Sequence, residues 1–460
     1  MNHREEADTM GTVLVPEDAY YGAQTQRAVE NFSLSGLRLP PSFIRVLGMI
    51  KKHAAAVNLG LGLLDKDLAD PIMTAAQEVI DGKLDDQFVV DVFQTGSGTS
   101  TNMNTNEVIA TRANEIVTGG KHTKSPIHPN DHVNKGQSSN DVIPTAIHVA
   151  ALVTIRDRLI PALEKLQQSL AAKATEFADV RKIGRTHLQD AVPLTLGQEF
   201  SGYARQVELG IERLRSTESR LAELALGGTA VGTGLNAHPE FAAKVIAGVA
   251  EETGCPFREA ANHFEAQAAQ DGAVEASGVL KTVAVSLVKI ANDIRWLASG
   301  PRCGFGEITI PSLQPGSSIM PGKVNPVIPE AVIQASAQVI GNDATITFGG
   351  QGGYFELNLM LPLIAYNLLQ SIDLLTSAAA RLTEKCVDGI TANRDKCVSY
   401  IEQSLAMCTP LVPVIGYDKS AAIAKEAFAK GKTVREVALE NNVLPEAELA
   451  RVLDKVVYGE

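Results

Sequence analysis

Hydrophobic residues in this chain recur mostly at steps of three and four, the spacing of an α-helix. Alternation typical of a strand is confined to Thr12 to Val15 and Ile308 to Ile310. Helical patterns occupy residues 41–63, 65–82, 100–117, 141–177, 196–226, 237–252, 271–299, 326–342 and 357–384. The chain is therefore predicted to be mainly α. Its 460 residues are too many for one simple core, so two or three structural units are expected.

The stretch from Asp271 to Leu297 is apolar around most of its circumference. A helix that is hydrophobic on all sides belongs inside a bundle. At 1.5 Å per residue this helix would be roughly 40 Å long. The surrounding bundle could come from other subunits or from the core of a monomer, and we favour the oligomer.

Composition narrows the possible functions. Aromatic residues make up only 5% of the chain, so the cores must consist mainly of small and aliphatic side chains. The net charge of −12 argues against nucleic-acid binding, which normally requires a basic surface. An acidic chain can still bind a small anion, because local groups determine a site.

The cysteines, the N-terminus and the apolar stretches indicate a soluble, reduced protein, which we expect to be cytoplasmic. The five cysteines have no CxxC spacing, which argues against disulfides, an iron–sulfur cluster or structural zinc. The charged N-terminus has no apolar signal region. The most apolar helical stretch, Leu357 to Ile372, is shorter than the roughly 20 residues that a membrane span needs.

Polar segments rich in glycine or serine lie between the helical stretches, at predicted helix starts. They are Thr95–Asn102, His128–Asp141, Gly184–Asp190 and Gly316–Pro326. Free N–H groups at helix N-termini bind anions, although any one such segment could simply cap a helix. There are four such segments, and three of them carry Lys or His. A shared anion pocket is therefore favoured over four separate helix caps.

Three further interpretations of these and neighbouring segments are disfavoured. Gly316 to Lys323 has Gly-x5-Gly-Lys spacing followed by Val324, whereas a phosphate loop needs Gly-x4-Gly-Lys and then Ser or Thr. Residues 227–234 lack the third glycine of a dinucleotide fingerprint. His128 and His132 have the spacing of metal ligands on a helix, but the intervening Pro-Asn-Asp favours a turn.

The run Gly316-Ser-Ser-Ile-Met-Pro-Gly-Lys-Val-Asn-Pro326 resembles the signature of the fumarase/aspartase superfamily. The other polar segments resemble that family's motifs in the expected order. Gln137-Ser-Ser-Asn-Asp141, Gly227–Gly234 and Asn262-His-Phe-Glu-Ala266 resemble its metal-free branch, the class II fumarate hydratases. Gly136 departs from the serine expected there, and Thr101 and Thr105 are more similar to aspartase.

The resemblance implies a mainly α, three-domain fold. An N-terminal helical domain would span residues 1–137, a central helical bundle 138–392 and a small C-terminal helical domain 393–460. It also implies a homotetramer with a twenty-helix core, in which three subunits build each active site. No metal and no cofactor would be required.

The implied activity is reversible conversion of (S)-malate to fumarate and water in the tricarboxylic acid cycle, by carbanion-type anti elimination. The resemblance assigns proton abstraction to Ser317 and the second catalytic position to His187, paired with Glu330. It assigns substrate binding to Ser97, Gly98, Thr99, Ser138, Ser139, Asn140, Thr186, Ser318, Lys323, Val324 and Asn325. The partner is thus a small dicarboxylate, with no nucleic acid and no membrane.

His128, Pro129, Asn130 and Asp131 match a second, non-catalytic dicarboxylate site of the family, and a simple surface turn is an equal alternative. Aspartate ammonia-lyase, which expels ammonia with the same loop, is the closest rival function. A catalytically silent helical scaffold is the remote one.

Overall fold

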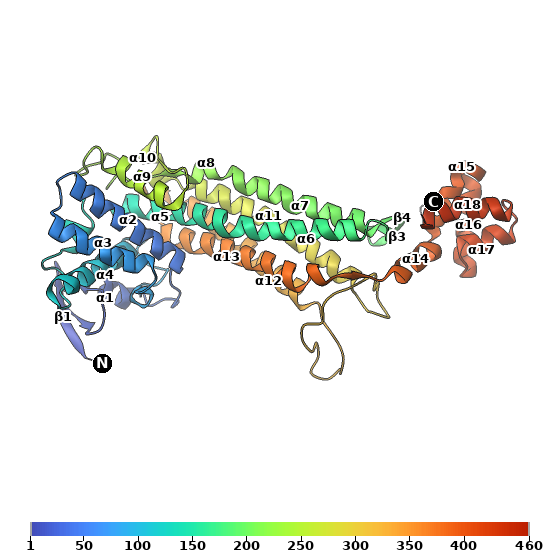
Figure 1. Ribbon diagram of the computed structural model, residues 1–460, viewed down its shortest axis with the longest axis horizontal. Helices are drawn as coiled ribbons and strands as arrows, with labels where there is room; N and C mark the ends of the chain where they lie inside the picture. The colour runs from blue at the N-terminus through green and yellow to red at the C-terminus, as the bar shows by residue number, and fades with distance from the viewer. Residues whose placement is uncertain (1, 459–460) are drawn as a thin grey trace. The chain divides into compact units, whose positions relative to one another are not determined.

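The computed structural model describes residues 2–458 and is built almost entirely of helices (Figure 1). The helices are α1 (Ala23–Asn31), α2 (Pro41–Gly60), α3 (Lys66–Ile80), η1 (Asp85–Gln87), α4 (Thr99–Thr118), η2 (Pro129–Val133), α5 (Ser139–Thr154), η3 (Ile155–Leu159), α6 (Ile160–Glu176), α7 (Leu196–Ser216), α8 (Glu218–Leu221), α9 (Phe241–Thr253), α10 (His263–Ala268), α11 (Asp271–Leu297), α12 (Val327–Gly350), α13 (Leu361–Lys385), η4 (Val387–Gly389), α14 (Arg394–Gln403), η5 (Leu405–Leu411), α15 (Val412–Ile415), α16 (Tyr417–Lys430), α17 (Val434–Glu440) and α18 (Glu446–Tyr458).

The strands are short and pair two by two. They are β1 (His3–Asp8) with β2 (Gly11–Pro16), β3 (Arg181–Thr186) with β4 (Gln189–Thr195), β5 (Glu223–Leu224) with β6 (Arg258–Glu259), β8 (Gly353–Tyr354) with β9 (Leu357–Asn358), and β7 (Ile308–Thr309) with β10 (Thr391–Ala392). The mainly α prediction is confirmed. Both predicted strand pieces are also present, as β2 and β7.

The chain divides into two compact units made of separate segments. Unit 1 consists of Met1–Pro161, Glu212–Ala284 and Ser336–Thr376. Unit 2 consists of Ala162–Ile211, Val285–Ala335 and Ser377–Glu460.

In unit 1, helix α2 packs against α3, and α3 packs against α4 (Figure 1). Pro41 starts α2, where its missing N–H costs nothing. The two helices come close at Gly48, where an added Cβ would lie 3.0 Å from a Val79 methyl group and 3.2 Å from the Ala76 carbonyl oxygen. The apolar face of α2 is therefore buried against its neighbours, and this packing holds the framework under the polar segments of unit 1.

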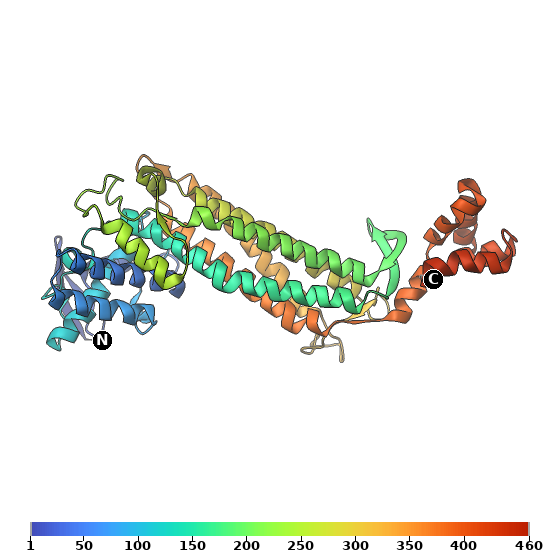
Figure 2. The ribbon, with the colours of Figure 1, turned by 45° about the horizontal axis from the view of Figure 1, so that its top comes forward.

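In unit 2, α6 and α7 run side by side and are joined by the β3–β4 hairpin (Figures 1 and 2). The C-terminal helices form their own small core around residues such as Leu411, Val437 and Leu453. Ile183 of β3 belongs to this core, so the hairpin is anchored to the C-terminal helices.

The long helix α11 is buried on one side only. Leu280, Leu287 and Ile294 are fully buried, whereas Val285 and Trp296 are 54% and 50% exposed.

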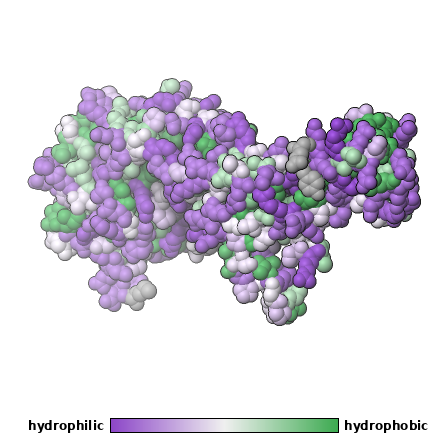
Figure 3. All heavy atoms as spheres, turned by 45° about the vertical axis from the view of Figure 1, so that its right-hand side comes forward, coloured by the Kyte–Doolittle hydropathy of each residue, from purple (hydrophilic) through white to green (hydrophobic). Residues whose placement is uncertain are grey.

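The face visible in Figure 3 is mostly hydrophilic, with hydrophobic residues in small separate areas. Among the described residues no single helix is long and apolar enough to cross a membrane, and one bent pair, Arg394–Gln403 with Leu405–Ile415, meets those criteria only jointly.

The structure corrects one sequence-based prediction. Gly184–Asp190 was expected at the start of a helix, but it forms the end of β3, a turn and the start of β4. The hydrophobic pattern does not predict this hairpin, because its residues do not alternate between apolar and polar side chains. Predicted helix positions otherwise agree, with η3 forming a π-helical segment between α5 and α6.

Replacing Leu47 with alanine tests the α2 packing. Leu47 is fully buried, so Leu47→Ala should lower the free energy of unfolding by about 2–5 kcal/mol through lost burial and a cavity. Leu63→Ala is the matched control, because Leu63 is 40% exposed. Denaturant titration followed by circular dichroism measures both, and equal shifts in the two variants would contradict the packing described.

Candidate active site

Two polar segments of unit 1 meet at the N-termini of α4 and α5. Ser97 Oγ lies 2.8 Å from Thr99 Oγ1, and Thr99 Oγ1 lies 2.6 Å from Ser139 Oγ. Ser138 caps α5, with its side-chain oxygen accepting the Asn140 N–H at 3.2 Å. Hydroxyl groups are thus gathered at the positive ends of two helices, as an anion site requires.

Gly98 is required where it stands. Its φ is +72°, and an added Cβ would lie 3.0 Å from Ile143 side-chain carbons. A left-handed conformation without a side chain lets the chain enter α4 directly beside α5. Gly96 is still more confined, because its Cβ would lie 1.9 Å from the Leu359 carbonyl oxygen.

The buried carboxylate of Asp141 ties this site to the glycine-rich segment 227–234. It accepts the backbone N–H groups of Ser138, Gly227 and Thr229, each at 3.0 Å. Burial raises the pKa of Asp141, and these N–H bonds oppose that rise. Asn140 adds a bond from its amide to the Ala230 carbonyl, at 2.7 Å.

The segment predicted as a second dicarboxylate site, His128–Asp131, forms a local turn. His128 Nδ1 accepts the N–H groups of Asn130 and Asp131 at 3.2 Å each, and Pro129 begins the π-helical turn η2. His132 Nδ1 accepts the His128 N–H at 2.9 Å, and burial lowers the pKa of His132. The described residues contain no group of side chains arranged to hold a metal ion.

His187 lies at the tip of the β3–β4 hairpin in unit 2. Thr186 pairs with Gln189, so His187 and Leu188 are the two turn residues. Both have positive φ, 58° and 60°, which makes this a left-handed two-residue hairpin turn. For residues with a Cβ this conformation costs roughly 1–2 kcal/mol each. Such strain is retained where the surroundings determine the backbone strongly.

A buried ion-pair network beside the turn supplies that constraint. Arg185 donates to both carboxylate oxygens of Glu307, at 2.9 and 3.0 Å, and Glu307 is fully buried. The Arg185 guanidinium also stacks over Phe305, 4.2 Å from the ring centre. Buried Lys182 lies 3.4 Å from Glu307 and 3.2 Å from Glu199. Arg185, which directly precedes Thr186, is therefore held by both Glu307 and Phe305.

The Gly316–Pro326 segment forms an exposed loop closed at its base. Gly316 N–H donates to the Lys323 carbonyl at 2.7 Å, and the Asn325 amide donates to the Gly316 carbonyl at 2.6 Å. Ser317 Oγ accepts the N–H groups of Ile319 and Met320, at 3.2 and 2.9 Å. These two bonds favour negative charge on that oxygen.

The remaining predicted residues of the loop have fewer partners in the single chain. Ser318, Lys323 and Val324 are exposed. Glu330 lies in the first turn of α12, and no hydrogen bond or ion pair between described residues joins it to His187. The structure thus gathers Ser97, Thr99 and Ser139 directly, whereas the His187–Glu330 pair is absent from the contacts described within this chain.

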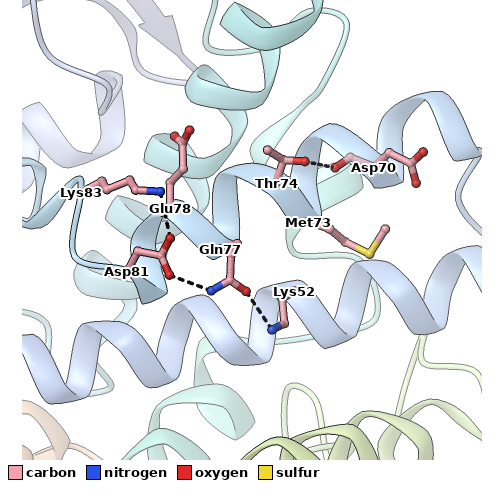
Figure 4. A pocket seen from close by; sticks show the side chains of 8 residues that line it. All are labelled: Lys52, Asp70, Met73, Thr74, Gln77, Glu78, Asp81 and Lys83. Carbon is pink, nitrogen blue, oxygen red and sulfur yellow. Dashed lines mark hydrogen bonds and ion pairs between the residues drawn. The ribbon is translucent and has the colours of Figure 1, made fainter.

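A separate hollow of about 600 Å³ on α2 and α3 contains none of the predicted site residues (Figure 4). Its charged side chains already have partners: Lys83 pairs with Asp81 at 2.9 Å, Lys52 with Glu252 at 2.7 Å and Glu78 with Arg112 at 2.6 Å. It therefore lacks free groups converging on a ligand.

Sequence reasoning missed Lys51, Asp141, Arg185 and Glu307 as supports of the site. Asp141 follows a serine pair at capping-box spacing, which is a visible signal. Nothing in the local sequence marks the other three, because their partners lie far along the chain.

The comparisons with known proteins agree with one another. The family model described as "Lyase" matches residues 11–341, and "Fumarase C C-terminus" matches residues 407–456. The chain is 57% identical to a "Fumarate hydratase class II" of Nitrosomonas europaea, over 95% of each chain. It is 58% identical to the protein so named in Halobacterium salinarum, over 98% of this chain and 96% of that one.

Solved structures are similar to this chain over nearly its whole length. A crystal structure of class II fumarase from Schistosoma mansoni has a TM-score of 0.95 at 39% identity, covering 99% of this chain and 98% of that one. A fumarate lyase:delta crystallin from Brucella melitensis in native form has a TM-score of 0.90 at 48% identity, covering 95% and 100%.

Removing the Arg185 side chain tests the buried network. Arg185→Met leaves the Glu307 carboxylate buried without its main partner, so the free energy of unfolding should fall by about 3–5 kcal/mol. Arg394→Met is the matched control, because Arg394 makes a similar two-bond pair with Asp179 at the surface. Thermal unfolding should barely change in that variant. If both variants unfolded alike, the network would not hold the hairpin.

Proposed function

The chain belongs to the class II fumarate hydratase family of lyases, and from that premise we propose how its residues carry out the reaction. It is a hydro-lyase that interconverts malate with fumarate and water, a reaction of the tricarboxylic acid cycle.

The reaction removes a proton from the carbon next to a carboxylate, and that carboxylate must take up the resulting charge. Fixed donors aimed at such developing charge are each worth on the order of 10²–10³ in rate. We propose that Thr99 and Ser139, at the positive end of the α5 dipole, bind one carboxylate of (S)-malate. Their mutual hydrogen bonds hold these donors in place before substrate arrives. Lys323 and Asn325 would bind the other end of the substrate.

Ser317 is the proposed base, and its two N–H bonds are the observation that carries this assignment. A free serine hydroxyl is far too weak an acid to act as a base near neutral pH. The N–H groups of Ile319 and Met320 point at its oxygen, and the Lys323 cation lies in the same loop. Both stabilise an alkoxide, which takes the proton from carbon and becomes the hydroxyl.

His187 is proposed to donate a proton to the departing hydroxyl, so that it leaves as water and anti elimination is completed. Imidazole has the intrinsic pKa for this task. In the family pattern a carboxylate at the position of Glu330 pairs with the histidine. Because Glu330 does not contact His187 within the described chain, we propose that this pair forms between subunits.

The proposed assembly is a homotetramer whose sites each draw on three subunits. Large hydrophobic side chains left exposed on one chain support it, including Val285, Trp296, Phe348 and Phe355, the last 93% exposed. Burying such surface is the dominant favourable term in association. We further propose the three-domain division at residues 137 and 392, and a cytoplasmic location.

The segment His128–Asp131 is proposed as a second dicarboxylate site of unassigned purpose. Asn130 and Asp131 are exposed, which supports access, but their N–H groups are already bonded to His128. A ligand there would have to rely on side chains.

The aspartase-like departures do not favour ammonia elimination. Thr101 and Thr105 are buried, and their hydroxyls donate to Gln94 and to the Thr101 carbonyl. They are thus structural in this chain. Gly136 has a φ of +75°, which explains a glycine there without reference to substrate. Thr101, Thr105 and Gly136 therefore no longer support the alternative function, aspartate ammonia-lyase.

Single substitutions test the two proton-transfer roles. Ser317→Ala and His187→Asn should each lower kcat for malate dehydration by about 10²-fold or more, the usual contribution of general acid–base catalysis. Fumarate absorbance measures the rate. Ser312→Ala, an exposed serine of the preceding segment, is the control and should leave the rate unchanged. Near-normal turnover in Ser317→Ala would refute the base assignment.

Mixing inactive variants tests the shared site. Ser317→Ala and Ser139→Ala chains, unfolded and refolded together, should regain activity, because about one site in four receives both intact residues from different subunits. Mixing Ser317→Ala with Lys323→Ala is the control, since both changes affect one loop and no intact loop can form. Equal activity in the two mixtures, with tetramers present, would contradict the proposed assembly.

A further inference from the structure

Lys51 on α2 is a fully buried cation beneath the anion-binding end of α5. Its ammonium donates to the side-chain oxygens of Asn102, Asn134 and Gln137, at 2.8, 3.0 and 2.9 Å. An ammonium has three donors, so all are used, and every acceptor is a neutral amide. Burying a charge without a directly bonded counter-ion is costly, and apolar residues often replace such groups without loss of stability. The lysine therefore calls for a functional reason.

The first such reason is the turn that Lys51 holds. Asn134, besides accepting from Lys51, donates to the Gln137 carbonyl at 3.1 Å. Asn102 and Asn106 donate to the same Asn134 oxygen, at 3.2 and 3.1 Å. Gln137 directly precedes Ser138, the N-cap of α5. The Lys51 ammonium thus holds the turn through Asn134 and Gln137, and this turn leads directly into the N-cap Ser138.

The second reason is charge. Asp141 is buried in the first turn of α5, where its carboxylate would repel a substrate anion. Burial has the larger effect on the pKa of Lys51 and lowers it, whereas the negative charge of Asp141 raises that pKa. The groups facing Lys51 from α4 and from the turn are the neutral amides of Asn102, Asn134 and Gln137. Lys51 therefore offsets the Asp141 charge, together with the three backbone N–H groups that bond the carboxylate.

We propose that Lys51 is a positioning residue for the dicarboxylate: it fixes the turn that presents Ser138–Asn140, and its charge keeps the N-terminus of α5 attractive to a carboxylate despite Asp141. This inference rests on the proposed function, because it concerns binding of that substrate. Lys51 does not touch substrate, so its effect is on affinity.

Lys51→Met tests the proposal, with Lys52→Met as the matched control. Lys52 is the next residue of α2 and pairs with Glu252 at the surface. At an effective dielectric constant of about 20, two unit charges on the order of 10 Å apart change binding about tenfold. The KM for malate should therefore rise about tenfold in Lys51→Met, with kcat within about threefold of the wild-type value. Lys52→Met should match the wild type.

The outcomes separate this proposal from the function itself. A folded Lys51→Met tetramer with unchanged KM would overturn the role of Lys51, while wild-type turnover would still support the hydratase. Absence of wild-type turnover with malate would instead refute the function. A fall in kcat alone would also overturn the proposal, because it predicts an effect on binding.

The pH dependence of wild-type KM gives a second test that needs no variant. Burial lowers the pKa of Lys51 to about 7. The ammonium is charged below that pH and neutral above it, and substrate binding favours the charged form. The wild-type KM should therefore rise between pH 7 and pH 9, and Lys51→Met should show a flatter profile. A wild-type KM constant over this range would overturn the charge role.

Discussion

The hydrogen bond between Thr99 and Ser139 brings two helix N-termini together, and the anion site of unit 1 depends on that junction. Each helix end has unpaired N–H groups, which ordinarily attract water or a capping side chain. Here the hydroxyls of Thr99 and Ser139 bond each other at 2.6 Å. Each hydroxyl can still form a further hydrogen bond to a ligand. Gly98 makes the approach possible, because any Cβ there would meet Ile143. The α2–α3 packing beneath keeps both helices in register.

The site in unit 2 is built differently, since a strained turn and an open loop carry its chemistry. His187 adopts a left-handed conformation that its own sequence does not favour. The Arg185–Glu307 pair and the small C-terminal core hold the strands on either side of it. Ser317, by contrast, is held only by N–H groups of its own loop. The proposed acid is thus fixed in place, whereas the proposed base lies in a loop that can close over substrate.

The sequence predicted the helices well because amphipathic periodicity is a local property. It failed at Gly184–Asp190, where a hairpin is imposed by partners far along the chain, among them Ile183's neighbours in the C-terminal core. The resemblance supplied the candidate residues, and the structure confirms that Ser97, Thr99 and Ser139 meet. It could not supply Lys51 or Glu307, because their roles depend on burial and on partners more than fifty residues away. Nor could one chain show a contact that is proposed to form between subunits.

The choice of water over ammonia as the leaving group is the central chemical claim. The relatives support it, and the buried positions of Thr101 and Thr105 remove the main local argument against it. The most direct test is the ratio of kcat/KM for L-malate to that for L-aspartate, with fumarate absorbance followed under identical conditions. The account predicts fumarate from L-malate, with a preference on the order of 10⁴ over L-aspartate, typical of a site that hydrogen-bonds a substrate hydroxyl. Equal or faster release of fumarate from L-aspartate would contradict it.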